Sequence, residues 1–494
     1  MPREKKRKSA PRKWKHGSVA AVAFLVVGIA ALSAAYLSPG IGVLPQWLLA
    51  IASLVIVGIL IKRSSALQGW GFVYLVGSTR GLDLIDAISR KARRFWNEMA
   101  VWGLVLGFGL LSYPLFKRMI SKKQYAFGMV SLVVIMFFVL PYIAYAVPFI
   151  NIPQFQSALS GGAAQQGVNY LGIAFDAVSV IGGFAGYVLA ALVYNAGLIV
   201  YGLAAFAASV SSGAPQPGLL TQSIPGVAPI IPGIDIPLFA GVVSLAILLL
   251  VHEVSHGLLA REAKVRLKSI GLLILGIVPV GAFVEPDEKQ VGRLSKDKQT
   301  KIFSAGISAN FVAMLAFVVP MALFLYFLLP GIMQSSGVFV SSTLKGYPAY
   351  DAIPVGSRIL SWDGYNISNL TDFANAGRGD LPNKTIAIVT SNGTYSFKAK
   401  PVNATHGIVG VSVYEGSGVK PGAYASSVYF LYTVFALSFM LNFLVGVVNL
   451  LPLPGFDGWQ IYRTNVRSQN ALKALTAIVI VSLVINVLQW IFYI

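Results

Sequence analysis

Long apolar segments recur along this chain and limit what it can fold into. Soluble domains average about 25% charged residues, whereas this chain has 11% charged and 56% hydrophobic residues. Runs long enough, or nearly long enough, to cross a bilayer as helices occupy residues 18–37, 45–61, 99–116, 124–148, 183–206, 236–260, 302–330, 426–450 and 471–494. The pattern predicts an α-helical polytopic membrane protein with about nine membrane segments.

The placement of the basic residues predicts how the chain lies in the cell membrane. The formal net charge is +20, and the lysines and arginines concentrate in short segments between apolar runs, including the basic start 1–16. Basic loops stay in the cytoplasm, so we expect a cytoplasmic N-terminus and no nucleic-acid partner. Counting from there, the end of the 236–260 run returns to the cytoplasm, where Arg261, Lys264, Arg266 and Lys268 follow.

Residues 335–420 differ from the rest because short β-branched strands alternate with turns there. We expect strands at 337–341, 357–362, 385–390, 394–399 and 407–413, with turns at Asp363-Gly364 and Asn392-Gly393. The stretch "PAYDAIPVGSRILSWDGYNISNLTDF" resembles a PDZ domain, which implies capture of peptide termini or segments by strand addition. Five N-x-S/T triplets, at Asn366, Asn369, Asn383, Asn392 and Asn403, all fall in this segment and indicate an extracytoplasmic location.

The boundaries of these segments divide the chain into five parts. Residues 1–16 are a basic cytoplasmic tail, and 17–235 form an N-terminal membrane region with an extracytoplasmic Pro/Gly-rich loop that we expect to be non-helical over 207–235. The inserted β-rich domain 335–420 separates two parts of a helical core, 236–334 and 421–494.

The most informative motif is His252-Glu253-Val254-Ser255-His256, which lies inside the 236–260 run. Two histidines at i and i+4 project from one helical face and can bind one metal ion, while Glu253 is placed to take a proton from a bound water. Ionisable side chains at membrane depth are costly, so they mark function by default. A purely structural pair of buried histidines is the alternative.

A hydrolytic zinc site needs a third protein ligand and an open position for water. The chain has no cysteine, so the ligand must supply nitrogen or oxygen. Asp457, after the helix-breaking "LPLPG", is the preferred candidate, and Glu285 in "GAFVEPDE" competes with it. The alternative for Asp457 is an ordinary helix cap. We expect His406, in the β-rich segment, to be a surface residue.

Three motifs together resemble the site-2 proteases, which are intramembrane zinc metalloproteases. They are "HEVSHG" at 252–257, "GISAN" at 306–310 and "NLLPLPGFDG" at 449–458. The stretch "KSIGLLILGIVPVGAFVEPDE" is similar to the membrane-embedded hairpin of that family, and an inserted PDZ-like domain is a family feature. The resemblance covers 236–494 well and 1–235 only loosely.

The resemblance implies a role for each matching residue. His252, His256 and Asp457 would bind Zn²⁺, Glu253 would be the general base, and Asn310 would hold the substrate backbone or the developing oxyanion. The expected reaction is hydrolysis of peptide bonds in or near transmembrane segments of membrane-protein substrates, as in regulated intramembrane proteolysis. Phe456 replaces the usual leucine and Ile307 the frequent proline. A packing role for a buried Asn310 stays open.

Two functions of other classes remain as alternatives. A membrane transporter or zinc-handling protein would use histidine and aspartate to line an ion path, but it gives Glu253 no role. An inactive scaffold would only bind peptides through residues 335–420. Zinc content and cleavage of a membrane-spanning reporter separate these alternatives from the protease.

Overall fold

The computed structural model describes residues 27–28, 43–65, 67–79, 81–150, 170–221, 223, 225–228, 230–276, 278–403 and 405–492. The chain divides into two compact units: unit 1 joins Met1–Val318 to Ala436–Ile494, and unit 2 is Val319–Phe435. The predicted tail 1–16, and all but two residues of the predicted first run 18–37, lie outside the described residues.

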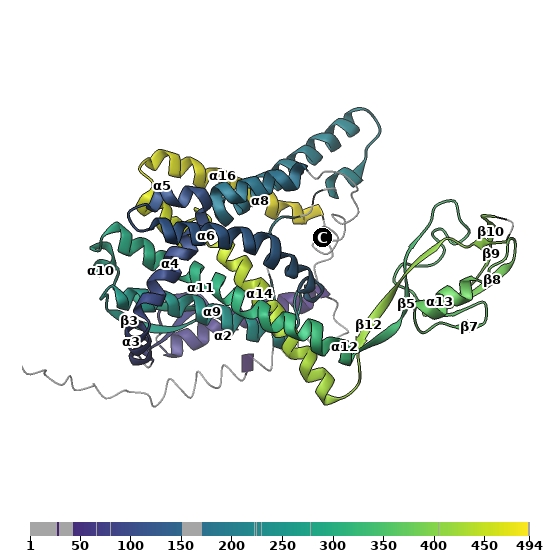
Figure 1. Cartoon of the computed structure of the whole chain (residues 1–494), viewed down its shortest axis with the longest axis horizontal. Coiled ribbons are helices and arrows are strands. Elements are labelled where there is room, and N and C mark those ends of the chain that lie inside the picture. Colours follow the sequence, from purple (N-terminus) through teal and green to yellow (C-terminus); the bar gives the residue numbers. More distant parts are fainter. Residues whose placement is uncertain are drawn as a thin grey trace, which may run out of the picture. The chain divides into compact units, whose positions relative to one another are not determined.

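Most predicted apolar runs coincide with helices. α2 (Val43–Ser65) covers the run 45–61. Seven helices of the described part are long and apolar enough to cross a membrane: Arg93–Phe116, Lys122–Tyr145, Gly172–Ser211, Leu238–Glu262, Lys296–Ile332, Ala423–Val448 and Gln469–Phe492. Their main elements, visible in Figure 1, are α4 (Arg93–Phe108), α6 (Lys122–Val134), α8 (Tyr170–Ser211), α9 (Leu238–Glu262), α11 (Lys296–Leu323), α14 (Ala423–Val448) and α16 (Gln469–Leu488).

The predicted non-helical connection 207–235 begins later than expected. α8 continues to Ser211, and η6 (Pro217–Thr221) adds a short 3₁₀ helix. The first proline of the segment is Pro215. Because the residues before it keep their backbone N–H groups, nothing interrupts the helix upstream. The prediction was therefore wrong for 207–211 and for the 3₁₀ turn.

Unit 1 also contains a four-stranded antiparallel sheet. Its strands, in spatial order, are β1 (Gly69–Trp70), β2 (Val73–Ser78), β3 (Leu267–Leu275) and β4 (Val278–Pro286). β3 and β4 form the hairpin that the family resemblance implied after the histidine helix. The pairing of β2 with β3 joins segments that are distant in the chain, from Val73–Leu275 to Ser78–Ile270. The sequence analysis did not foresee this pairing, and it leaves β4 at one edge of the sheet.

The C-terminal end of α9 is held by a short helix, α3 (Leu82–Lys91). Ile85 of α3 is buried in the apolar cluster around Leu258 and Leu259. Ser89 Oγ donates a hydrogen bond of 2.9 Å to the Leu258 carbonyl, and Arg261 forms a two-pronged ion pair with Asp86. These contacts fix the helix that carries the histidines.

α11 packs closely against α4 through small residues. A Cβ on Gly103 would lie 1.9 Å from Ser308 Oγ, so only glycine allows this approach. Ser308 turns its hydroxyl back to the Ser304 carbonyl, 2.7 Å away, which satisfies its hydrogen-bonding capacity inside the helix. Small residues of this kind let membrane helices approach one another. The opposite side of α11 therefore lies toward α9.

Unit 2 is β-rich and has its own apolar core. The sheet runs in the order β12-β5-β6-β8-β9, with β7 paired to β6 and a separate β10–β11 pair. Bounds are β5 (Met333–Thr343), β6 (Arg358–Trp362), β7 (Tyr365–Asn366), α13 (Leu370–Gly377), β8 (Thr385–Thr390), β9 (Gly393–Lys398), β10 (Lys400–Pro401), β11 (Gly407–Ile408) and β12 (Val411–Val419). Figure 1 shows β5 and β12 side by side as a long ladder.

The two predicted turns of this unit fared differently. Trp362 pairs with Tyr365, and both Asp363 and Gly364 have positive φ, which confirms the turn at Asp363-Gly364. Thr390 pairs with Gly393, so the second turn consists of residues 391–392, one residue before the predicted pair. The PDZ-like character of 335–420 stays a prediction.

Candidate metal centre

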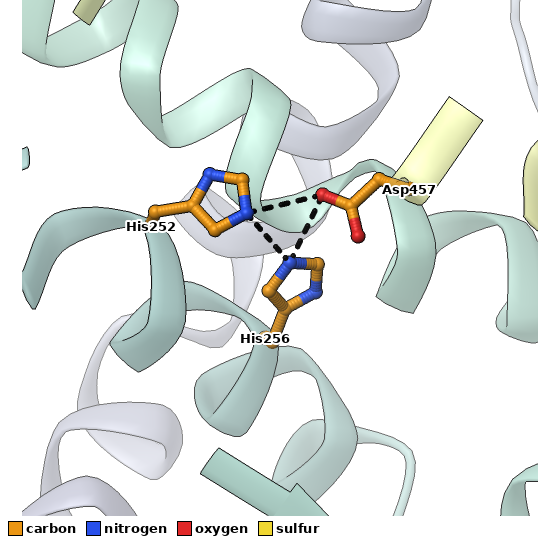
Figure 2. Close-up of side chains that lie close together, drawn as sticks. All are labelled: His252, His256 and Asp457. Atoms are coloured by element: carbon orange, nitrogen blue, oxygen red, sulfur yellow. Dashed lines mark hydrogen bonds and ion pairs between the residues drawn. The ribbon is translucent and has the colours of Figure 1, made fainter. Parts of the chain in front are cut away.

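His252 and His256 lie on one face of α9, as their i, i+4 spacing requires. Pro237 precedes the helix, and Lys264, with a φ of 67°, follows its end and turns the chain toward β3. The two Nε2 atoms are 3.3 Å apart. Figure 2 shows both rings directing these nitrogens toward the same point.

Asp457 reaches this point from a distant part of the chain. It is the first residue of α15 (Asp457–Asn465), and its Oδ2 lies 3.2 Å from His252 Nε2 and 3.1 Å from His256 Nε2 (Figure 2). The loop before it folds back on the end of α14, where the Gly458 N–H donates to the Asn449 carbonyl at 2.7 Å. A Cβ on Gly458 would lie 2.5 Å from the Leu450 carbonyl carbon, so this close return requires glycine.

The donor set fits a zinc ion. Two imidazole nitrogens and one carboxylate oxygen are the ligands of many catalytic zinc sites, which keep a fourth position open. Donors bonded tetrahedrally at about 2.0–2.1 Å lie about 3.3 Å from one another, close to the separations of 3.1 to 3.3 Å here. Among the described residues, these three form the group of histidine and acidic side chains that could hold a metal ion.

Glu253 follows the first histidine and contacts the sheet. Its Oε2 accepts a hydrogen bond of 3.2 Å from the Val284 N–H of β4. Val284 is paired with Ile270 of β3, but β4 is an edge strand, and this N–H meets Glu253 instead of a neighbouring strand. The carboxylate that the sequence analysis expects to act as the base is therefore oriented by main chain from a different element.

Each histidine has a partner on its second ring nitrogen. His256 Nδ1 lies 2.8 Å from the carbonyl oxygen of Ile302, and His252 Nδ1 lies 3.1 Å from the side-chain amide of Asn310. Both partners come from α11. Asn310 is fully buried, and its Oδ1 has no hydrogen-bond partner. Asn310 thus lies beside the candidate metal centre.

The competing candidates lie elsewhere. Glu285 accepts hydrogen bonds from Lys268 Nζ at 2.8 Å and Ser269 Oγ at 2.9 Å, and these bonds lower its pKa. It belongs to a half-exposed ion pair and not to the three-residue group. Asp457 is not the N-cap of α15, since Phe456 holds that position. His406 is only partly buried and lies in unit 2.

Sequence reasoning missed the main-chain groups of the site. Every residue has a backbone carbonyl like that of Ile302, and every residue except proline has a backbone N–H like that of Val284. No sequence pattern therefore marks these two groups. In the sequence, Gly306 stands out only as part of the motif "GISAN". A Cβ there would lie 2.5 Å from atoms of both rings. The i, i+4 spacing of Gly306 and Asn310 on α11 was the available signal.

Part of the chain resembles known proteins. Residues 240–488, half of the chain, match the model of peptidase family M50. An uncharacterised protein of Methanocaldococcus jannaschii is 30% identical over 229 residues, which are 46% of this chain and 57% of that protein. The chain thus spans somewhat more than half the length of that relative. With its apolar helices, the chain is a multi-pass membrane protein that belongs to peptidase family M50, the site-2 protease family.

Proposed function

We propose that this protein is a zinc metalloendopeptidase that hydrolyses peptide bonds within or near transmembrane segments of membrane proteins. One observation carries the proposal: three zinc-type donors from two distant segments converge within 3.3 Å, and an acidic residue follows the first donor. The expected substrates are membrane-protein helices, and regulated intramembrane proteolysis is the expected setting.

The residues of the site divide the chemistry among them. His252, His256 and Asp457 would hold a zinc ion, which would supply a Lewis acid that polarises a water molecule and the scissile carbonyl. Glu253 accepts the proton of the attacking water and later passes it to the leaving amine. Asn310 donates a hydrogen bond to the carbonyl oxygen as charge develops on it.

The substrate must present an extended backbone to this site. A helical segment hides its peptide groups in internal hydrogen bonds, so it has to unwind before cleavage. β4 supports this step because it is the edge strand of the sheet and its Val284 N–H meets Glu253. Unpaired strand edges hold extended peptides through main-chain hydrogen bonds.

The predicted topology belongs to the same proposal. The N-terminus would be cytoplasmic, together with the basic residues after α9, and residues 335–420 would lie outside the membrane on the other side. Of the five asparagines in N-x-S/T triplets, Asn366, Asn383, Asn392 and Asn403 are exposed. The PDZ-like domain would bind peptide termini or segments of substrates, and the five predicted parts of the chain belong to this proposal as well.

Cleavage of a membrane-spanning reporter tests the proposal. Wild-type protein, reconstituted in lipid with zinc, should cleave the reporter, and Glu253→Gln should slow cleavage about 10²–10⁴-fold, the usual contribution of a general base. Zinc content of the variant, measured by metal analysis, should stay at the wild-type level because Glu253 is not a ligand. Equal cleavage by both proteins would refute the mechanism and favour the transporter or the scaffold.

A further inference from the structure

Both histidines direct Nε2 toward the centre, and metal binding through Nε2 requires a particular protonation of the other ring nitrogen, Nδ1. A neutral imidazole that binds a metal through Nε2 carries its proton on Nδ1. That Nδ1–H is normally held by an acceptor, which sets the tautomer and the orientation of the ring. The Nδ1 partners of His252 and His256 therefore decide whether the rings are prepared for an ion.

For His256, a backbone carbonyl supplies the acceptor for Nδ1–H. Its Nδ1 lies 2.8 Å from the Ile302 carbonyl oxygen. A carbonyl oxygen can only accept, so Nδ1 must be the donor, and in the neutral ring Nε2 keeps its lone pair. No side chain is needed for this ring.

His252 depends on a side chain instead. Its Nδ1 faces the amide of Asn310, whose Nδ2 lies 3.1 Å away while Oδ1 is buried without a partner. In that orientation Nδ2 donates, so the ring proton sits on Nε2, which faces Asp457 Oδ2 at 3.2 Å. Rotating the side-chain amide of Asn310 by a half turn keeps its shape and exchanges the positions of its oxygen and nitrogen. Oδ1 then accepts from Nδ1–H, and the buried oxygen gains a partner.

Gly306 explains how the amide reaches the ring. It lies one helical turn before Asn310 on α11, on the same face. A Cβ at Gly306 would lie 2.5 Å from His252 Nε2 and from His256 Nε2, so glycine allows the helix to touch both rings. The spacing G-x-x-x-N thus places bare backbone against the two rings and an amide against Nδ1 of the first.

We propose that Asn310 is a positioning residue for His252: its side-chain oxygen accepts the Nδ1–H and thereby fixes the tautomer that binds zinc. The amide NH₂ is then left over as a donor on the other side, where Oδ1 lies now. The inference rests on the proposed function only in that the centre binds zinc.

Zinc affinity of the full-length protein, measured by competition with a chelator, tests this inference without any substrate. Asn310→Leu keeps a similar volume but has no acceptor, and it should weaken Zn²⁺ binding about 10–100-fold, the usual effect of losing an outer-shell partner. Asn310→Asp keeps an acceptor and should bind Zn²⁺ at least as tightly as wild type. It lacks the amide donor, so reporter cleavage should still fall about 10²–10³-fold.

Asn442 of α14 offers a matched control. It too is a fully buried asparagine with an unpartnered Oδ1, and its Nδ2 donates within its own helix to the Ser438 carbonyl at 2.8 Å. Asn442→Leu should leave zinc affinity unchanged. The absorption spectrum of bound Co²⁺ should shift in Asn310→Leu and not in Asn442→Leu, because only the first changes the environment of a ligand ring.

Three results would overturn the inference while the proposed function stands. These are wild-type zinc affinity in Asn310→Leu, equal loss of zinc in Asn310→Asp and Asn310→Leu, and equal loss in Asn442→Leu. Circular dichroism and thermal unfolding show whether each variant folds. If Asn310→Leu does not fold, zinc loss in a folded Asn310→Asp variant still refutes the acceptor role. A wild-type protein that binds no zinc would refute both the inference and the proposed function.

Discussion

The two compact units bury polar side chains in different ways. In unit 1, fully buried polar residues such as Ser308, Asn310 and Asn442 lie on apolar helices, and His252, which is also buried, contacts Asn310. In unit 2, a single apolar cluster that includes Val338, Ile359 and Ile386 forms the core. Asp380 is a buried acid there, and Trp362 Nε1 donates to both of its oxygens at 3.1 and 3.2 Å.

This difference distinguishes the residues that serve the chemistry of the site from the residues that stabilise the fold. Apolar residues fill the core of a soluble β domain because burying them is the main driving force for folding. Lipid-facing helices are apolar on every side, so hydrophobicity alone does not decide which faces meet, and polar or small residues must. The polar residues of unit 1 that converge on one point are therefore the best candidates for function. Changes there should affect zinc, and changes in unit 2 should affect stability.

Replacing Asp457 by alanine should give the strongest effect on zinc. The carboxylate is the third donor, 3.1 to 3.2 Å from both ring nitrogens, so its loss should weaken zinc binding by more than the 10–100-fold typical of an outer-shell change. Chelator competition on the purified protein measures this effect. Glu285→Ala is the control, because Glu285 pairs with Lys268 and should not alter zinc binding. The opposite ranking would transfer the ligand role to Glu285.

Adding one methyl group at Gly306 tests whether α11 must touch the rings. A Cβ at this position would lie 2.5 Å from both Nε2 atoms, so Gly306→Ala should displace a ring and weaken zinc binding about 10–100-fold. Gly197→Ala on α8 is the matched control, since a Cβ there meets nothing within 4 Å. Alanine favours a helix interior over glycine by about 1 kcal/mol. The control should bind zinc normally, and equal affinities in both variants would contradict the packing.

Truncating a core side chain of unit 2 should lower stability and leave zinc binding unchanged, the reverse of the effects expected at the site. Ile359 is fully buried in the apolar cluster, so Ile359→Ala should lower the free energy of unfolding of this unit by about 2–5 kcal/mol. Zinc affinity should not change, because none of the three donors belongs to unit 2. Thermal unfolding and chelator competition on the same sample measure both quantities. A loss of zinc in Ile359→Ala would mean that the two units are energetically coupled.

The smallest effect is expected on the pH dependence of the stability of unit 2, through the titration of Asp380. Burial raises the pKa of Asp380 above the usual value, while the Trp362 hydrogen bond opposes the shift. A raised folded-state pKa favours the protonated form, so unit 2 should be most stable below the unfolded pKa of about 3.9 and lose stability as pH rises through the folded pKa. Asp380→Asn should remove that slope, measured by thermal unfolding at a series of pH values upward from about 3.9. A wild-type stability that rises across this range would contradict the assignment.

Residue patterns alone were enough for the local parts of the fold and the site. Hydrophobic length located the membrane helices, because a helix must match the bilayer thickness. The i, i+4 spacing placed His252 and His256 on one face through helix geometry that needs no other part of the chain. The strands of unit 2 followed from β-branched runs between turns, although the turn at residues 391–392 was shifted by one residue.

Tertiary structure decided everything that depends on distant partners. Local propensity could not place Asp457 within 3.2 Å of two nitrogens on α9 or pair β2 with β3, because these contacts join segments that are far apart in the chain. It could not find the Ile302 carbonyl or the Val284 N–H, because backbone groups are nearly the same in every residue. Side-chain types and their spacing determined the chemistry, and its geometry arose only when helices packed closely enough for backbone and side chains to meet.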